Sequence, residues 1–98
     1  MTFLVKVRVK QSTLNEFAAA LQARALDNSR VRGETWCRKN EPAVGYSVWE
    51  TPDRRDFDAR FDPWRRYYEQ VEITEVISPA DAMKALLRNA TESPEGRG

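Results

Sequence analysis

Apolar and polar side chains alternate strictly at the start of the chain. Over residues 3–10 every second side chain is apolar, and one face carries Phe3, Val5, Val7 and Val9. A period of two residues is typical of a β-strand, so a first strand is expected here. The other face carries Lys6 and Arg8, which we expect in solvent or, alternatively, along a cavity for an anionic ligand.

Helical spacing replaces this alternation after Thr13. One stripe of the expected helix carries Leu14, Phe17, Ala18, Leu21 and Ala25. Thr13 and Glu16 have the spacing of a capping box, and we expect the helix to end near Asp27. A loop over residues 28–33 follows, because Asn, Ser and Gly favour turns.

Two more stretches, residues 34–40 and 45–50, read as strands and are separated by a polar turn over residues 41–44 that contains a proline. This pattern predicts an antiparallel hairpin. In the second of these strands, Tyr46 lies on one face, whereas Ser47 and Trp49 lie on the other.

A second helix is expected directly after this hairpin. Residues 51–53 (Thr-Pro-Asp) suit a helix start, with Thr as the cap and Pro in the first position. Phe57 and Phe61, four residues apart, would face the sheet. Pro63 is expected to break or kink this helix.

The last expected elements are a strand over residues 71–77 and a helix that begins at Ser78. Residues 89–98 are polar and contain Gly, Glu and Pro, and we expect them to form a disordered tail. The domain is therefore expected to span residues 1–88.

The order strand, helix, strand, strand, helix, strand predicts an α+β fold of the ferredoxin-like split βαβ type. It is a four-stranded antiparallel sheet with two helices on one face, plus a C-terminal helix. The other face of the sheet has little chain to cover it. We therefore expect a homodimer in which two sheets close into a dimeric α/β barrel.

Composition limits the classes of partner. Sixteen basic and fifteen acidic residues leave a net charge of +1, so nucleic acid is not expected. The start has no signal peptide or membrane-spanning run, and the single Cys37 has no partner for an internal disulfide, so a cytoplasmic protein without membrane contact is expected. The chain has no histidine, and we expect neither a metal nor a cofactor.

Four short motifs carry a resemblance to a known group. They are Phe-Leu-Val-Lys-Val at residues 3–7, Gly-Glu-Thr-Trp at 33–36, Tyr-Ser-Val-Trp-Glu at 46–50 and Asp-Pro-Trp at 62–64. Together they resemble the muconolactone isomerase group of the dimeric α/β-barrel superfamily. Relatives there include cofactor-independent aromatic monooxygenases and polyketide cyclases. The resemblance implies proton transfer beside a carbonyl by a glutamate of the first helix. That position falls near Gln22, where this chain has no acid within several residues.

Arg38 and Tyr46 are the candidate catalytic residues. Arg38 offers a guanidinium to a carboxylate or enolate oxygen, and Tyr46 offers a phenol to a ligand carbonyl. We expect Tyr46 to line the ligand cleft and Trp49 to pack at the dimer contact; the reverse assignment is the alternative. A structural alternative places Trp36 in the core and pairs Arg38 with an acid.

The candidate substrate-binding residues are aromatic: Phe17, Trp36, Trp64, Tyr67 and Tyr68. The segment 64–68 is aromatic and basic and would close over a flat ligand, or else pack at a subunit interface.

The expected function is that of a cofactor-independent isomerase or cyclase acting on a small cyclic or polyketide-derived metabolite through enolate stabilisation. A cofactor-free aromatic or polyketide monooxygenase and a non-catalytic small-molecule-binding dimer are the alternatives.

Overall fold

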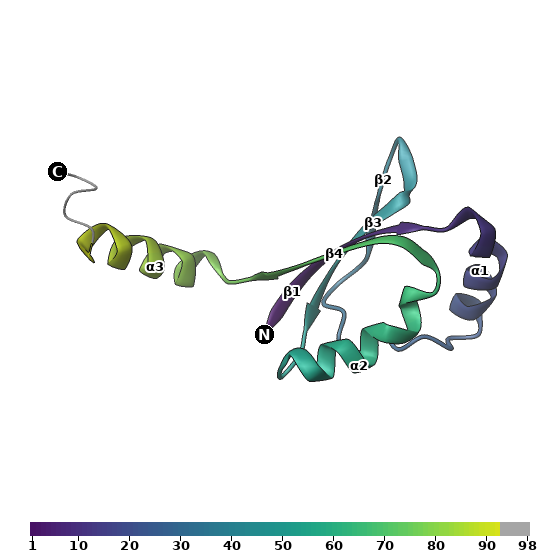
Figure 1. The fold of residues 1–98 in the computed structure, drawn as a ribbon, viewed down its shortest axis with the longest axis horizontal. Coiled ribbons are helices and arrows are strands. Elements are labelled where there is room, and N and C mark those ends of the chain that lie inside the picture. The colour runs from purple at the N-terminus through teal and green to yellow at the C-terminus, as the bar shows by residue number, and fades with distance from the viewer. Residues whose placement is uncertain (93–98) are drawn as a thin grey trace.

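The computed structural model describes residues 1–92 of the chain. Its elements are β1 (Thr2–Val9), a 3-10 turn η1 (Gln11–Thr13), α1 (Leu14–Gln22), β2 (Trp36–Arg38), β3 (Glu41–Glu50), α2 (Arg54–Arg65), β4 (Tyr68–Val76) and α3 (Pro79–Glu92). The four strands form one antiparallel sheet in the order β2-β3-β1-β4. Helices α1 and α2 lie on the same face of this sheet (Figure 1). The predicted ferredoxin-like α+β fold is confirmed.

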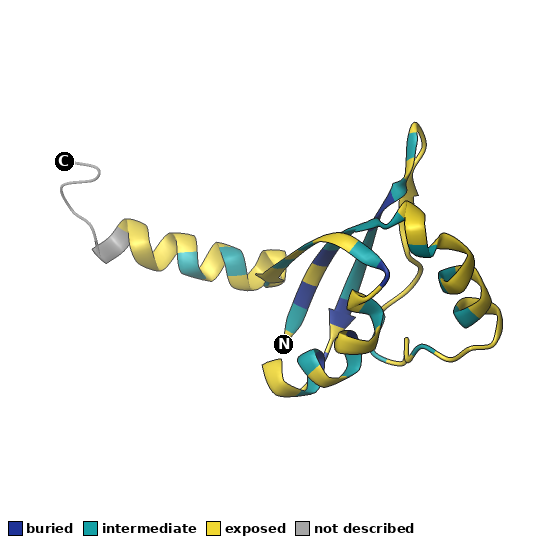
Figure 2. Ribbon diagram, turned by 45° about the vertical axis from the view of Figure 1, so that its right-hand side comes forward, coloured by how far each residue is buried: buried dark blue, intermediate teal, exposed yellow. Residues whose placement is uncertain are grey.

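The core lies between the sheet and α2. It consists of Phe3 and Val5 from β1, Trp49 from β3, and Phe57 and Phe61 from α2, each at most 2% exposed. Figure 2 shows these buried positions gathered in the middle of the strands and on the inner side of α2. The apolar face of β1 therefore packs against the apolar side of α2, as the two-residue period of β1 and the four-residue spacing on α2 predict.

The register of the central strands decides which side chains face the helices. Phe3 lies opposite Trp49, and Lys6 lies opposite Tyr46. Because side chains alternate across a sheet, Trp49 joins Phe3 on the helix side and Tyr46 lies on the uncovered face. The expected placement of Tyr46 in the cleft and Trp49 at a dimer contact is wrong. Trp49 faces the helices, and Tyr46 faces away from them.

Helix α1 is shorter than expected, ending at Gln22 rather than near Asp27. Arg24 takes a left-handed backbone conformation, with φ of 55°, and the amide of Ala25 donates to the carbonyl of Ala20 at 3.0 Å. This six-to-one bond is the Schellman arrangement that terminates helices. The expected capping box is also absent, because the Thr13 side chain makes no capping hydrogen bond.

The hairpin forms, but its turn lies at residues 39–40 and β3 begins at Glu41. Arg38 pairs with Glu41, whereas Cys37 pairs with Gly45, so the register shifts between the two partners. This bulge leaves residues 42–44 without a partner on β2 and accommodates a proline that has no amide to donate.

The N-cap of helix α2 lies two residues later in the chain than expected, and the helix continues through its proline. Asp53 is the N-cap and accepts from the amide of Asp56 at 2.8 Å, while the Thr51 hydroxyl donates to the Asp53 carbonyl at 2.8 Å. Pro63 lies inside the helix, which ends at Arg65. Pro63 therefore does not break the helix, which was one of the two outcomes expected for it.

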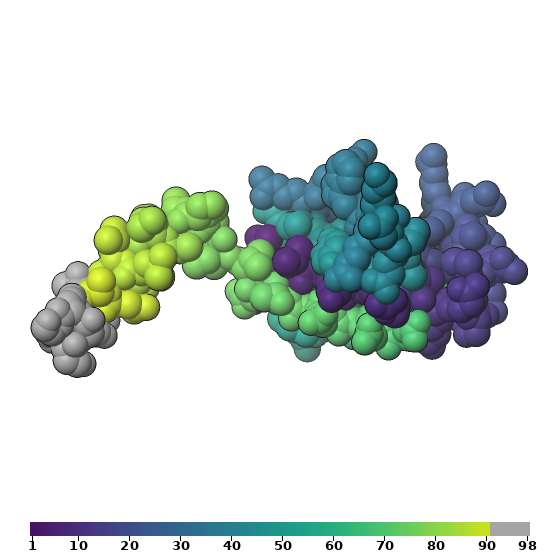
Figure 3. Space-filling view, turned by 90° about the horizontal axis from the view of Figure 1, so that it is seen from above, coloured from purple at the N-terminus to yellow at the C-terminus, as the bar shows by residue number. Residues whose placement is uncertain are grey.

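Helix α3 extends from the end of β4 away from the rest of the molecule (Figures 1 and 3). The radius of gyration is 17.5 Å, against about 13 Å for a compact chain of this length. The helix runs to Glu92, beyond the boundary at residue 88, and residues 93–98 of the expected tail lie outside the described residues. No helix within residues 1–92 has the length and apolar character needed to cross a membrane.

Candidate functional site

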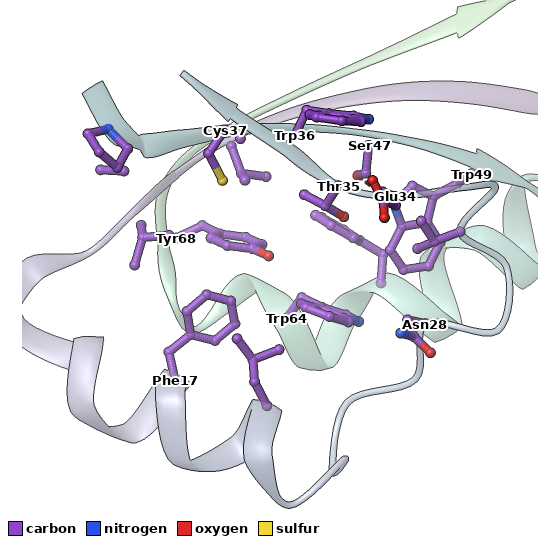
Figure 4. A pocket seen from close by; sticks show the side chains of 18 of the residues that line it. Phe17, Asn28, Glu34, Thr35, Trp36, Cys37, Ser47, Trp49, Trp64 and Tyr68 are labelled. Carbon is purple, nitrogen blue, oxygen red and sulfur yellow. Dashed lines mark hydrogen bonds between the residues drawn. The ribbon is translucent and has the colours of Figure 1, made fainter. Parts of the chain in front are cut away.

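A pocket of about 720 Å³ lies between the sheet and its two helices (Figure 4). The sheet contributes Val7, Gly45, Ser47 and Trp49; the helices contribute Phe17, Leu21, Phe61 and Trp64. The loop that leads into β2 supplies Asn28, Val31, Glu34 and Thr35. This volume is in the range of small-molecule sites, which are concave and mostly apolar.

Aromatic rings form most of one wall. The ring of Phe17 lies 5.7 Å from that of Tyr68 and 6.2 Å from that of Trp64, in edge-to-face geometry. The ring of Trp49 lies 6.3 Å from that of Trp64, also edge to face. Because these rings support one another, they present fixed flat surfaces that suit a cyclic ligand.

Three residues bring hydroxyl groups to the pocket wall: Thr35, Ser47 and Tyr68. The indole Nε1 of Trp49 donates to the Oγ of Ser47 at 3.0 Å, which leaves the serine hydroxyl proton to donate elsewhere. Burial raises the pKa of the Tyr68 phenol, with the nearby thiol of Cys37 as the smaller cause. Tyr68 therefore stays protonated and able to donate at neutral pH.

The ionisable residues of the pocket wall are Glu34, Cys37 and Tyr68, and no Lys or Arg is among the described residues that line it. Glu34 is exposed, at the margin of the pocket, just after Gly33, whose φ is 75°. The pocket therefore combines neutral donors with one carboxylate. Nowhere in residues 1–92 do three Cys, Asp or Glu side chains gather as they would around a metal ion.

Four of the five predicted substrate-binding residues line this pocket: Phe17, Trp36, Trp64 and Tyr68. Trp36 lies at its rim, and its side chain is largely exposed, at 68%. Tyr67 does not line the pocket. It is buried, and its ring stacks on that of Phe17 at a centroid distance of 4.9 Å, so it supports the aromatic wall from behind.

The predicted catalytic residues contact each other but lie outside the pocket. Arg38 Nε donates to the Tyr46 hydroxyl at 2.8 Å, and Arg38 also pairs with Glu41 at 2.8 Å. These bonds raise the pKa of Arg38. Arg38 is thus paired with an acid, as the structural alternative stated, and Tyr46 lies on the uncovered face of the sheet.

Sequence reasoning missed Ser47 and Asn28 as pocket residues, and it placed Trp49 there only as the alternative assignment. Strand phase already grouped Ser47 with Trp49, so the correct choice of face would have found both. Asn28 and Glu34 belong to a loop without periodicity. Val31 in this loop forms an isolated bridge with Trp49, and this contact brings the loop to the pocket.

A hydrogen-bonded cluster fixes the start of this loop. Asp27 accepts from the amide of Ser29 at 2.8 Å, from its hydroxyl at 2.6 Å and from Arg60 at 2.7 Å. The Nε1 of Trp64 donates to the Asp27 carbonyl at 3.0 Å. These contacts hold the loop against α2, and the bonds from Ser29, followed by that from Arg60, lower the pKa of Asp27 to about 2.

We expect this cluster to contribute to acid sensitivity. An aspartate whose pKa is lowered on folding stabilises the fold above its ordinary pKa near 4, and the contribution is lost as the pH falls from about 4 to about 2. Asp27→Asn should therefore show a smaller decrease in the free energy of unfolding between pH 5 and pH 2.5 than the wild type, measured by urea denaturation. Ser29→Ala should lie between the two. Equal decreases in all three proteins would contradict this expectation.

Comparison with known proteins bears on the fold. No protein-family model and no curated protein matches the chain. Its fold is similar to that of 5-chloro-2-hydroxyhydroquinone dehydrochlorinase from Burkholderia phenoliruptrix AC1100, solved in complex with 2,5-dihydroxybenzoquinone. The TM-score is 0.54 at 11% identity, over 83% of this chain and 98% of the other. The two chains share the four-stranded α+β fold described above.

A second solved structure is an antibiotic biosynthesis monooxygenase, with a TM-score of 0.48 and 13% identity over 79% of this chain and 98% of that one. At 11% identity, the likeness to the dehydrochlorinase shows a shared fold alone. The chemistry of the pocket has to be argued from its own residues.

Proposed function

We propose that the chain is a cofactor-independent isomerase or cyclase that acts on a small cyclic or polyketide-derived molecule in the pocket between sheet and helices. The observation that carries the proposal is the combination of fixed aromatic walls with the neutral donors Ser47 and Tyr68 and the single carboxylate Glu34. Such a site holds a ring in one orientation and stabilises an oxygen that gains negative charge.

In the proposed reaction Glu34 accepts a proton from a carbon beside a ring carbonyl. The electron pair of the broken C–H bond moves into the carbonyl group, whose oxygen accepts hydrogen bonds from Ser47 and Tyr68. For an isomerisation, Glu34 then returns the proton to another carbon of the same ligand, which shifts a double bond. For a cyclisation, the enolate carbon instead bonds to a second carbonyl carbon of the ligand, and Glu34 returns the proton to the oxygen of that carbonyl. These three residues take the place of Arg38 and Tyr46, which lie outside the pocket.

A neutral ring is the ligand that this wall suits best. No cation lines the described part of the pocket, so an anionic ring would be placed beside Glu34 without compensation. The dehydrochlorinase of the same fold, which was solved with 2,5-dihydroxybenzoquinone, supports the small size and cyclic nature of the ligand.

Ligand screening under two atmospheres tests the proposal. The protein is incubated with 2,5-dihydroxybenzoquinone, 1,2,4-trihydroxybenzene and a series of cyclic ketones and lactones, and complexes are detected by native mass spectrometry. We expect binding of cyclic carbonyl compounds and conversion of at least one of them equally in air and under nitrogen. Conversion that consumes oxygen would favour the monooxygenase alternative. Binding without conversion would favour a binding protein, and absence of binding would refute the ring pocket.

We also propose that a second copy of the chain covers the free face of the sheet. Figure 3 shows that no helix covers this face, and it carries exposed Leu4, at 39%, next to half-buried Val48 and Tyr46. Helix α3 carries a second uncovered apolar group, in which Met83 is 55% and Leu86 62% exposed. Two free apolar surfaces on one small chain favour association of identical copies.

Leu4→Arg should convert such a dimer to a monomer, because two charged side chains would meet without partners at the contact. The matched control is Leu14→Arg, which alters a leucine of similar exposure, 45%, on α1. Light scattering after gel filtration measures the mass, and circular dichroism verifies the fold. A monomeric wild type, or a Leu4→Arg protein that remains dimeric at the same concentration, would contradict the proposal.

A further inference from the structure

A second cavity, of about 580 Å³, opens at the C-terminal end of α1. Its wall consists of Leu21, Arg24, Leu26, Asp27, Asn28, Ser29 and Trp64. Three of these residues, Leu21, Asn28 and Trp64, also line the pocket between sheet and helices. The two cavities are therefore adjacent and share part of their walls.

The second cavity has a different charge from the first. It contains two ionisable residues, Arg24 and Asp27. Asp27 is already neutralised by Arg60 at 2.7 Å and accepts two further hydrogen bonds from Ser29. Arg24 forms no hydrogen bond or ion pair with another side chain among residues 1–92. The charge available to a ligand in this cavity is therefore positive.

The backbone holds Arg24 at this position. Its amide donates to the Leu21 carbonyl at 3.1 Å, and the following amide of Ala25 reaches back to Ala20. The left-handed conformation of Arg24, with φ of 55°, closes α1 and directs the chain toward Asp27. A cation is also favoured beside the free carbonyl groups at the end of a helix.

We propose that the second cavity binds a carboxylate on a short side chain of the ligand, and that Arg24 selects for this group. The inference rests on the proposed function of the first pocket as a ring site. Glu34 would repel a carboxylate in the first pocket, so an acidic ligand enters with its ring against Trp64 and its acid toward Arg24. The amide of Asn28, on the shared wall, offers a second donor.

Two probes of matched size test this assignment: 4-hydroxyphenylpropionate carries the carboxylate, and 4-propylphenol replaces it with a methyl group. Dissociation constants are measured by tryptophan fluorescence at low salt. We expect Arg24→Gln to weaken binding of the acid about tenfold, as for loss of a charge-assisted hydrogen bond, while binding of 4-propylphenol stays within about twofold. Arg24→Lys should retain part of the preference for the acid over 4-propylphenol. Added salt should weaken binding of the acid and leave binding of 4-propylphenol unchanged.

Control variants separate the subsite from general effects. Arg55→Gln removes a charge from the exposed side of α2 and should leave both constants unchanged. Arg24→Gly suits the left-handed backbone and removes the charge, so it should reproduce Arg24→Gln even if glutamine disturbs the turn. Equal binding of the acid by the wild type and both neutral variants, with 4-propylphenol still bound, would overturn the subsite alone. If the wild type binds neither probe, the ring pocket fails, and the subsite fails with it.

Discussion

Tyr68→Phe should lower kcat about 100-fold in a protein that remains folded. The change removes one hydroxyl from a half-buried ring and keeps the ring itself, so the aromatic wall with Phe17 is preserved. Removal of one donor to a developing oxyanion costs about 10²–10³ in kcat in other enzymes. KM should change much less, because the bond strengthens mainly as the negative charge develops.

The pH profile gives this prediction a second measurement. Burial raises the pKa of Tyr68 above its ordinary value near 10, so the phenol remains a donor through neutral and mildly alkaline pH. We therefore expect no decline of wild-type kcat from ionisation of Tyr68 below pH 10. The same shift means that the fold favours the protonated phenol, so its contribution to stability is complete below pH 10 and is lost at higher pH.

Tyr67→Phe is the matched control for Tyr68→Phe. The two tyrosines are adjacent and both contact Phe17, but Tyr67 does not line the pocket. Steady-state kinetics on the ligand identified by screening should show near wild-type turnover for Tyr67→Phe. Equal turnover in Tyr68→Phe and the wild type would remove Tyr68 from the proposed mechanism.

Phe57→Ala should lower the free energy of unfolding by about 3–5 kcal/mol, the usual cost of removing a buried phenylalanine ring. Phe57 is 0% exposed. Its ring lies 4.7 Å from that of Phe3, 5.5 Å from that of Trp49 and 5.3 Å from that of Phe61. Phe57 thus contacts rings of both the first strand and the third, so the cavity left by alanine would loosen the sheet from α2. The total free energy of unfolding of a native domain is about 5–15 kcal/mol, so this loss would be a large part of it.

Urea denaturation at constant pH measures this loss. Arg55→Ala, on the exposed side of the same helix, is the control and should change the free energy of unfolding by no more than about 0.5 kcal/mol. If Phe57→Ala does not fold at 25 °C, Phe57→Leu should fold with a smaller loss. A Phe57→Ala protein as stable as Arg55→Ala would show that the core is not centred on this ring.

The sequence predicted the fold because each element carries a period that local chemistry enforces. Alternation in β1 and the spacing of Phe57 and Phe61 on α2 define faces without any knowledge of the other strands. The face of β3 could not be chosen in this way. Tyr46 and Trp49 are both large and amphipathic, and only the pairing of Phe3 with Trp49 shows which of them joins the core.

The pocket was predicted in part for the same reason. Phe17, Trp64 and Tyr68 belong to or adjoin periodic elements, and their positions followed from the fold. Glu34 lies in a loop whose course depends on long-range contacts, namely the bridge between Val31 and Trp49 and the bond from Trp64 to Asp27. Such contacts join residues that are distant in sequence, so no local sequence pattern predicts them.

Strand β2, which contributes Trp36 and Cys37 to the pocket, is the least anchored part of the pocket wall. Strand β2 has three residues, pairs only with β3, and loses register between Cys37 and Arg38, whereas β1 is hydrogen-bonded on both sides. The amide protons of β2 should therefore exchange with solvent deuterium well before those of β1. Opening at this edge would widen the space above Tyr68 without separating Phe3 from Phe57. Such local fluctuation would let a bulky ring enter while the hydrophobic core stays intact.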